Sequence, residues 1–324
     1  MIHLSDPPLL SIVLINWNSA LFIKNCINSL KRQTFKHFDL LFIDNSSTDG
    51  SVALFKRYSP HTRLIKNKIN KGYAFAANQG IENTNGDMVL IMNTDVVLTK
   101  TFIENIIKEA CKHEDTGSFG GKLLRFCGSE PKSNVIDSTG LVLCNSIRRP
   151  TDRGMLEKDT GQYNKSEHVF GINGAAVCYR RKMLNDIKIC GEYFDKDFFC
   201  YFEDVDLAWR SVLFGWKSMY VSSAIAYHYR GGSKGENQII LRIYSSRNRY
   251  LIYLKNEPFI IFLKYLPLII FVEFFRILKY MFREQVSIIG FLLFIKQIPM
   301  FLRKRKKIQK RKKIKTANLE KWYF

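Results

Sequence analysis

This 324-residue chain lacks the cysteine pattern of a disulfide-rich or zinc-binding protein. The scattered cysteines are Cys26, Cys111, Cys127, Cys144, Cys178, Cys190 and Cys200. No two of them form a C-x-x-C pair and their number is odd, which argues against a disulfide framework and for a reducing compartment. The chain also does not open with a basic segment followed by an apolar one, so we expect no signal peptide.

An uninterrupted apolar stretch of transmembrane length is missing as well. Residues 258–302 are rich in Phe, Ile and Leu, but Lys, Arg and Glu side chains interrupt them. The longest uncharged run, residues 285–295, has eleven residues. A spanning helix takes about 20 consecutive apolar residues, so we expect this region not to cross a bilayer.

Part of this region instead predicts an amphipathic helix. The charged residues on one side of the helical wheel are Glu273, Arg276, Lys279, Arg283 and Glu284. The apolar residues opposite are Phe271, Phe274, Phe275, Leu278, Met281 and Phe282. Such a helix either lies in a membrane interface or packs its apolar face on the rest of the protein. Ten of the thirteen residues 303–315 are Lys or Arg, which favours an anionic membrane surface, at about 1 kcal/mol for each basic residue.

The formal net charge of +21 leaves a non-enzymatic nucleic-acid-binding protein as one alternative. Such a protein needs basic and aromatic residues interleaved across its folded domain. Here the positive charge is concentrated in residues 303–315, so we expect no nucleic acid partner.

The first hundred residues alternate apolar strands with helices. The predicted strands are residues 9–15, 38–43, 62–66 and 88–92. The first predicted helix between them runs from Ser19, a candidate N-cap, to about Arg32. A second ends at Tyr58, and a third begins beyond Gly72. Repeated β-α-β units predict a doubly wound sheet with ligand sites at the carboxyl ends of its strands. Residues 117–229 predict shorter strands, loops and two helices, with residues 144–168 as an exposed excursion.

Two polar clusters follow the first two strands. Asn16, Trp17 and Asn18 end the first strand, and Asp44 and Asn45 open a turn-rich segment after the second. A carboxylate such as Asp44 could accept the N–H of a pyrimidine base, and Trp17 could stack on that base. Ordinary turn chemistry is the competing interpretation, because loops rich in Asn and Asp are common.

Two further clusters are typical of phosphate and metal binding. Gly72 lies at a helix N-terminus, where free N–H groups and the helix dipole favour a phosphate. Asp95 follows the fourth strand, and its hard oxygen ligands suit Mg²⁺ or Mn²⁺ held against a diphosphate. A single Asp is a poor metal site. His228 is a candidate second ligand if the fold carries it back to Asp95, and is otherwise a structural histidine.

The acidic cluster Glu203, Asp204 and Asp206 opens a predicted helix. The helix dipole helps to keep such carboxylates ionised, and an ionised carboxylate in a cleft can take a proton from a sugar hydroxyl. A solvated acidic turn is the alternative, but the flanking aromatic residues argue against full solvation.

These four clusters, in this order and at these separations, resemble those of the inverting glycosyltransferases of family two, which have the GT-A fold. The branch that includes rhamnosyl- and galactofuranosyl-type transferases is the most similar. The resemblance covers roughly residues 10–233. It implies that Asp44 binds the base, that Asp95 is the surviving Asp of the metal-binding D-x-D motif, and that Asp204 is the catalytic base, with Glu203 next to test. It also implies that His228 is a metal or diphosphate ligand.

The resemblance further assigns the segment from Asn173 to Ala176, followed by Arg180 and Arg181, to the wall that holds sugar and acceptor. The residues expected to bind the nucleotide sugar are Asn16, Trp17, Asn18, Asp44, Asn45, Asn70, Gly72, Asn78, Asn93, Thr94 and Gly174.

Two departures from the family pattern bear on the mechanism. Asn93 stands where many relatives have the first Asp of D-x-D, and no Q-x-x-R-W sequence follows Arg210. The second departure disfavours a processive synthase. A sugar-1-phosphate nucleotidyltransferase is the other enzymatic alternative, but such enzymes commonly carry a Gly-rich phosphate loop where this chain has Asn16, Trp17 and Asn18.

We therefore expect an α/β protein with a GT-A type doubly wound mixed sheet and C-terminal amphipathic helices. Residues 1–235 would form the glycosyltransferase domain, residues 236–302 a membrane-associating region and residues 303–324 a basic tail. The expected reaction is inverting transfer, with Mg²⁺ or Mn²⁺, from a dTDP-rhamnose or UDP-sugar donor. The expected acceptor is a lipid-linked glycan at the cytoplasmic face of the membrane, in cell-surface polysaccharide synthesis.

Overall fold

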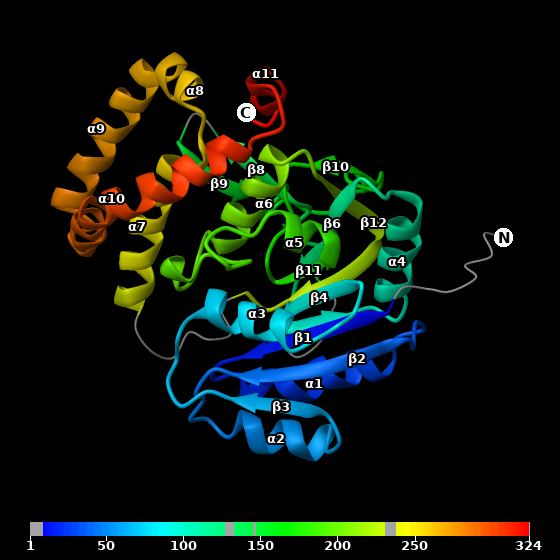
Figure 1. The fold of residues 1–324 in the computed structure, drawn as a ribbon. Helices are drawn as coiled ribbons and strands as arrows, with labels where there is room; N and C mark the ends of the chain where they lie inside the picture. The colour runs from blue at the N-terminus through cyan, green and yellow to red at the C-terminus, as the bar shows by residue number, and fades with distance from the viewer. Residues whose placement is uncertain (1–8, 127–132, 145–146, 231–237, 324) are drawn as a thin grey trace.

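The structure is a computed structural model that describes residues 9–126, 133–144, 147–230 and 238–323 (Figure 1). Its centre is one mixed sheet with the strand order β10-β12-β6-β11-β4-β1-β2-β3. Four of these strands form the parallel half: β1 (Leu10–Asn16), β2 (Phe38–Asp44), β3 (Arg63–Lys66) and β4 (Met88–Asn93). The helices that connect them are α1 (Ala20–Lys31), α2 (Ser51–Tyr58) and α3 (Tyr73–Glu82). The expected α/β class with a mixed sheet is confirmed.

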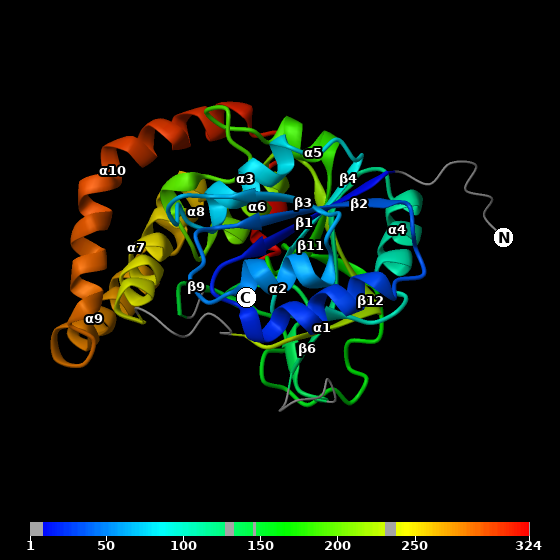
Figure 2. The ribbon, with the colours of Figure 1, turned by 90° about the horizontal axis from the view of Figure 1, so that it is seen from below.

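The continuous apolar run of β1 reflects burial on both faces of the sheet, since all seven of its residues are buried. Leu14 packs in the hydrophobic layer that contains α1, α2 and α4 (Phe102–Lys112). Val13, on the opposite face, packs with the small alanines of α3. Figures 1 and 2 show these helices on the two sides of the sheet.

The second half of the sheet has longer strands than we expected. It contains β6 (Thr116–Arg125) and β12 (Lys217–His228), with β11 (Ala176–Arg180) antiparallel to both β4 and β6. Small residues interrupt the apolar pattern of β6 because neighbouring elements come very close; a Cβ on Gly121 would lie 2.0 Å from the Ala224 carbonyl oxygen. The shorter strands of this half are β5 (Val96–Leu98), β7 (Ile136–Ser138) and β10 (Glu167–Val169). The two expected helices are α5 (Arg181–Asp186) and α6 (Glu203–Leu213).

The excursion expected at residues 144–168 is only partly exposed. Strands β8 (Leu141–Cys144) and β9 (Arg149–Asp152) pair in a separate small sheet. Between them, Arg148 is buried and donates two 2.8 Å hydrogen bonds to the carboxylate of Glu257. One of the polar residues in this excursion, Arg148, therefore forms a buried ion pair instead of facing solvent.

Five helices complete the described chain: α7 (Gln238–Asn256), α8 (Phe259–Lys264), α9 (Leu266–Phe282), α10 (Val286–Arg311) and α11 (Thr316–Glu320). Helix α10 packs along α7 and continues through residue 302, where we expected a boundary. Its basic half contacts the folded domain. Lys304 donates a 2.6 Å hydrogen bond to Asp195 and also bonds Asp197, and Arg311 bonds backbone carbonyls at residues 186 and 188.

Helix α9 turns Glu273 and Arg276 of its charged side toward the protein and the phenylalanines of its apolar side outward. Glu273 accepts hydrogen bonds from Arg249 and Arg276. On the other side Phe271 is 62% exposed and Phe282 is 76% exposed. The alternative in which the apolar face packs on the domain is therefore wrong.

Among the described residues, α10 alone is long and apolar enough to cross a membrane, judged by length and composition. Its best 18-residue window has a mean hydropathy of 1.6. This differs from the sequence expectation, because Lys296 lies inside the apolar part of α10 and interrupts its uncharged run.

Candidate active site

The carboxyl ends of β1 and β2 are joined by a buried hydrogen-bond network. The parallel register sets Asn16 opposite Asp44, and both side chains are fully buried. The amide of Asn16 donates to Asp44 Oδ1 at 2.8 Å and to the hydroxyls of Ser47 and Ser51 at 2.9 Å. The second oxygen of Asp44 accepts the backbone N–H of Ser47 at 3.2 Å. The turn after β2 is thus held to the end of β1.

A second set of Asn side chains holds the entrance to α3. Asn45 donates to Asn70 Oδ1 at 2.7 Å and to the Gly72 carbonyl at 3.2 Å. Gly72 has a φ of +88°, and a Cβ there would lie 2.5 Å from the Phe199 carbonyl oxygen. Only glycine fits this conformation and this contact.

Three other predicted donor-site residues take different positions. Asn18 has a φ of +46° and accepts the N–H of Thr48 at 2.8 Å, so it shapes the same turn. Trp17 is half-buried at the end of β1. Asn78 uses both ends of its amide on the backbone of Phe194, at 2.7 and 2.8 Å. The position of Asn78 therefore indicates a structural contact between α3 and the segment before α6.

The end of β4 joins the same edge. Ser19, at the N-cap position of α1, directs its hydroxyl to Asn16 and, at 2.6 Å, to Thr94 instead of capping the helix. The backbone N–H of Asn93 donates to the Ala175 carbonyl at 2.9 Å. These contacts bring the segments with Asp44, Thr94 and Gly174 together.

The fold also carries His228 back to Asp95. Antiparallel pairing of β12 with β5 aligns His228 with Val96, and His228 Nε2 lies 3.5 Å from Asp95 Oδ1. The other ring nitrogen lies 2.7 Å from Asp137 Oδ2. Burial opposes the charge on His228, but Asp137 and Asp95 outweigh it and raise its pKa to about 9.

The chemistry of this pair fits a divalent cation. No group of three or more His, Cys, Asp or Glu side chains gathers in metal-binding geometry within the described residues. However, among the described residues the buried Asp95 Oδ1 has no hydrogen-bond partner beyond its 3.5 Å approach to His228, and the imidazole of His228 is backed by the carboxylate of Asp137. A histidine that binds a metal commonly donates its other ring N–H to a carboxylate, which orients the imidazole. Two protein ligands would leave room for diphosphate oxygens.

A chain of ion pairs continues from His228 across the site. Asp137 also accepts a 3.1 Å hydrogen bond from Arg230, which in turn bonds Asp152. Asp152 accepts a 2.7 Å hydrogen bond from Asn173, the neighbour of Gly174. No local sequence motif pointed to Asp137 or Asp152; Asp137, for example, is 91 residues from its partner His228.

The three acidic residues of α6 have two different environments. Asp206 is fully buried and bonds Arg210 and Lys255, both at 2.9 Å, so it belongs to a structural ion network. Asp204 Oδ2 accepts the backbone N–H of Gly174 at 2.8 Å. Glu203 Oε2 is buried and has no hydrogen-bond partner in the part of the chain that the structure describes. Of the three, Glu203 and Asp204 remain available for chemistry.

Burial sets the protonation of these two groups. It raises the pKa of Asp204 to about 6, against the N–H donors of Gly174 and Val205 and with help from the negative charge of Asp152. Burial and the charge of Asp204 hold the pKa of Glu203 well above its usual range. Asp204 is therefore a stronger base than an ordinary aspartate and is largely ionised at neutral pH.

Tyr73, the first residue of α3, relates the two halves of the site. Its hydroxyl donates to the Gly174 carbonyl at 2.9 Å. Burial raises its pKa, and so do the negative charges of Glu203, Asp204 and Asp95. The negative charges of Asp95, Glu203 and Asp204 thus all affect the pKa of one hydroxyl, that of Tyr73.

Two other predicted residues are elsewhere. Arg180 bonds the carbonyls of residues 110, 113 and 116, and Arg181 bonds those of residues 81 and 86. The register pairs Arg180 with Met88, at the start of β4, while the site lies at the other end. The expectation that this pair lines the acceptor wall is therefore wrong, because both guanidinium groups satisfy backbone oxygens.

Comparisons with known proteins identify the family and the fold of the chain. The family model of glycosyl transferase family 2 matches residues 11–188. The N-acetylglucosaminyl-diphospho-decaprenol L-rhamnosyltransferase of Mycobacterium tuberculosis is 26% identical over 257 residues, which cover 70% of this chain and 78% of that protein.

Two solved structures share the fold. The mannosyltransferase PcManGT from Pyrobaculum calidifontis, in complex with GDP-Man and Mn²⁺, has a TM-score of 0.53 and 14% identity, covering 97% of this chain and 79% of that chain. GalNAc-T7 with UDP, GalNAc and Mn²⁺ has a TM-score of 0.61 and 10% identity, covering 77% of this chain and 48% of that chain.

Proposed function

The chain belongs to glycosyl transferase family 2, and on that premise we propose that it is a metal-dependent inverting transferase that moves a sugar from a nucleoside diphosphate to a lipid-linked glycan. Two observations carry this proposal: His228 Nε2 lies 3.5 Å from Asp95 Oδ1, and Asp204 accepts the N–H of Gly174, whose carbonyl accepts the hydroxyl of Tyr73. The negative charges of Asp95 and Asp204 both raise the pKa of that tyrosine. A carboxylate–imidazole pair suits the cation of a diphosphate donor, and a carboxylate with a raised pKa suits the removal of a proton from a hydroxyl.

In this proposal the oxygen of the acceptor hydroxyl attacks the anomeric carbon from the side opposite the diphosphate, which leaves. Asp204 takes the proton of that hydroxyl as the new bond forms. The N–H of Gly174 holds the carboxylate in place at 2.8 Å. Asp95 and His228 would hold Mg²⁺ or Mn²⁺, which when bound supplies positive charge to the departing diphosphate. The turn built on Asn16 and Asp44 would receive the base of the donor.

The donor and acceptor are proposed from likeness. The mycobacterial relative is named as an L-rhamnosyltransferase that acts on a lipid diphosphate. It supports dTDP-rhamnose as the first donor to test, ahead of UDP-sugars, and a polyprenyl diphosphate glycan as acceptor. The role that follows is a step in cell-surface polysaccharide synthesis.

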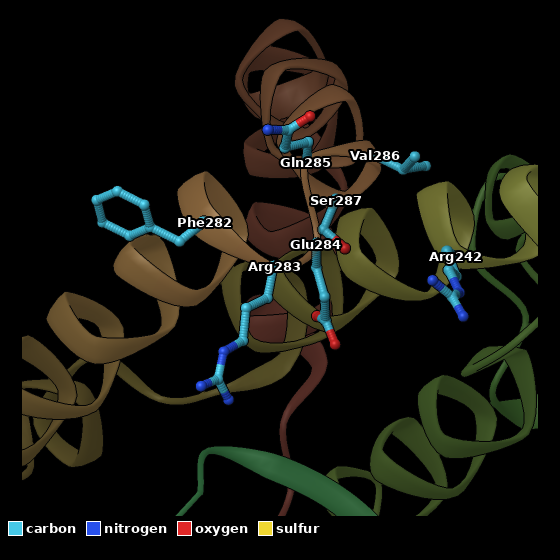
Figure 3. A pocket seen from close by; sticks show the side chains of 7 residues that line it. All are labelled: Arg242, Phe282, Arg283, Glu284, Gln285, Val286 and Ser287. Carbon is cyan, nitrogen blue, oxygen red and sulfur yellow. The ribbon is translucent and has the colours of Figure 1, made fainter.

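The outward face of α9 supports a peripheral position on the cytoplasmic face of the membrane. Phe271, Phe274 and Phe275 are each more than half exposed. At the turn between α9 and α10, the exposed Phe282 and two arginines help to line a hollow of about 240 Å³; Figure 3 shows Arg242 and Arg283 on either side of Glu284. Exposed phenylalanines next to cationic groups suit the boundary between acyl chains and anionic headgroups.

The deciding experiment is a donor screen with the full chain, Mn²⁺ or Mg²⁺ and a short lipid-linked acceptor, with detection of the released nucleotide. We expect release of a nucleoside diphosphate that depends on acceptor. Asp204→Asn is expected to abolish turnover and to leave donor binding nearly unchanged. Release of pyrophosphate from a nucleoside triphosphate and a sugar phosphate would favour the nucleotidyltransferase alternative, and near-normal turnover of Asp204→Asn would remove that residue from the mechanism.

Membrane binding is tested separately with vesicles that contain anionic lipid. The triple variant Phe271→Ser, Phe274→Ser and Phe275→Ser is expected to lose sedimentation with the vesicles and to keep its fold. Leu21→Ser is the matched control, because Leu21 is 86% exposed on α1, outside this face. Equal sedimentation of the triple variant and the control would refute the assignment. Point substitutions are preferred to truncation after residue 257. Truncation would delete Lys304 and leave its buried partner Asp195 without that hydrogen bond.

A further inference from the structure

The segment that leads into α6 has an unusual backbone. Phe199, Tyr201 and Phe202 have φ values of +65°, +67° and +68°, a region that bulky side chains rarely adopt. The Cys200 N–H donates to the Phe198 carbonyl at 2.8 Å and closes a γ-turn. Strain of this kind persists only where surrounding contacts impose it. The segment leads directly into Glu203, the first residue of α6, so its shape sets the position of the helix start that carries Asp204.

One fully buried side chain on α7 supplies those contacts. The amide of Asn248 donates to the carbonyls of Phe198, Cys200 and Tyr201 at 2.8, 2.8 and 2.9 Å. Its neighbour Arg247 donates to the carbonyls of Asp197 and Phe198 at 2.7 and 3.0 Å. An amide has only two hydrogens, so the three carbonyls share them.

The opposite side of the same segment touches the predicted donor site. The Phe199 carbonyl accepts the N–H of Ala74 at 3.3 Å and lies against Gly72. The Phe199 ring stacks on Tyr244 of α7, with centroids 4.8 Å apart. The segment is thus held between α7 and the start of α3.

Helix α10 in turn supports this part of α7. A Cβ on Gly290 would lie 2.0 Å from Ser246 Oγ, so the two helices touch beside Asn248. Helix α10 is therefore connected to residues 198–202 through α7, and Figure 1 shows α7 and α10 next to each other.

We propose that Asn248 is a positioning residue for the transfer reaction, which fixes the left-handed segment 198–202 and so directs Asp204 at the acceptor hydroxyl. This inference rests on the proposed function. Asn248 touches neither donor nor acceptor in this assignment. Its loss should change the chemical step and leave donor binding intact.

The test compares Asn248→Ala and Asn248→Asp with the parent enzyme. Both variants remove the amide donor, and the second keeps the size of the side chain. We expect kcat to fall by about 10²-fold, the cost of a misplacement of about 1 Å, while the donor KM stays within about threefold. Amide hydrogen exchange in residues 198–204 should become faster, with α4 unchanged.

Ile107→Ala is the control, because Ile107 is buried on α4, away from this segment. It lowers global stability by cavity formation but should leave kcat within about threefold at a temperature where it stays folded. If a variant folds poorly, the exchange of residues 198–204 relative to α4 still decides the question. Unchanged exchange there, or a kcat within threefold of the parent in a folded variant, would overturn the proposal.

The two proposals fail in different ways. Activity in the parent that survives Asp204→Asn contradicts the assigned base and the direction of its carboxylate. Activity that Asp204→Asn abolishes but Asn248→Ala preserves contradicts only the role of Asn248.

Discussion

The acid limb of the transfer rate provides a direct test of Asp204. The ordinary pKa of this side chain, 3.8, is raised to about 6 in the folded protein. The base must be ionised to accept a proton, so the rate should fall as the pH falls through 6. With a pKa of about 6, roughly nine tenths of Asp204 is ionised at pH 7 and about one tenth at pH 5. The rate at pH 5 should therefore be about tenfold below its plateau.

The assay is single-turnover release of nucleoside diphosphate at saturating donor, from about pH 4.5 to 8. Protonation of His228 competes with metal binding, so a limb caused by that group shifts when the Mn²⁺ concentration is raised. A limb caused by Asp204 does not shift. Running the profile at two metal concentrations separates the two causes.

Asp152→Asn is the accompanying variant. The charge of Asp152 contributes to the raised pKa of Asp204, so removing it should move the limb to lower pH. A profile that is flat between pH 5 and 8, or a limb that keeps its position in Asp204→Asn, would refute this reasoning.

Three further predictions test neighbouring parts of the structure. Asp95→Ala should weaken Mn²⁺-dependent donor binding by at least about tenfold in calorimetry, because two ligands cannot be reduced to one without loss; an unchanged affinity would contradict its role. Gly174→Ala places a Cβ 3.2 Å from Asp204 Oδ2 and should lower kcat about tenfold, with donor affinity as the control. Arg148→Met should cost about 3–5 kcal/mol in urea unfolding, because it leaves the buried Glu257 without its ion-pair partner, and adding Glu257→Gln should restore much of that loss; purely additive costs would argue against the pair.

Local patterns were sufficient for much of the fold. The apolar run at residues 9–15 corresponds to β1, because a strand buried on both faces needs apolar residues at every position. The turn residues after Asp44 and the glycine at position 72 likewise mark where elements end. Such features depend on neighbours in sequence, and a single sequence contains them.

The long strands β6 and β12 were harder to predict. Gly121 is small because it approaches Ala224, about one hundred residues away in the chain. The glycine at this position therefore reflects a tertiary contact, and by itself it does not predict a strand.

The division of labour within the acidic cluster also depended on tertiary structure. Asp204 and Asp206 are two residues apart on one helix, so they face different directions. One meets Gly174 at the site and the other meets Lys255 of α7. The family resemblance pointed to Asp204, but the residue pattern of the helix alone did not distinguish the two.

The sequence by itself determined that the chain alternates strands and helices, that polar residues cluster at the strand ends, and that residues 271–282 are amphipathic. Only the tertiary structure decided that the phenylalanines of α9 face outward while Glu273 meets Arg249. It also decided that Arg180 serves the backbone and that His228 returns to Asp95. The physical reason is that periodicity defines the faces of an element, whereas the partner of each face is fixed by packing between segments far apart in the chain.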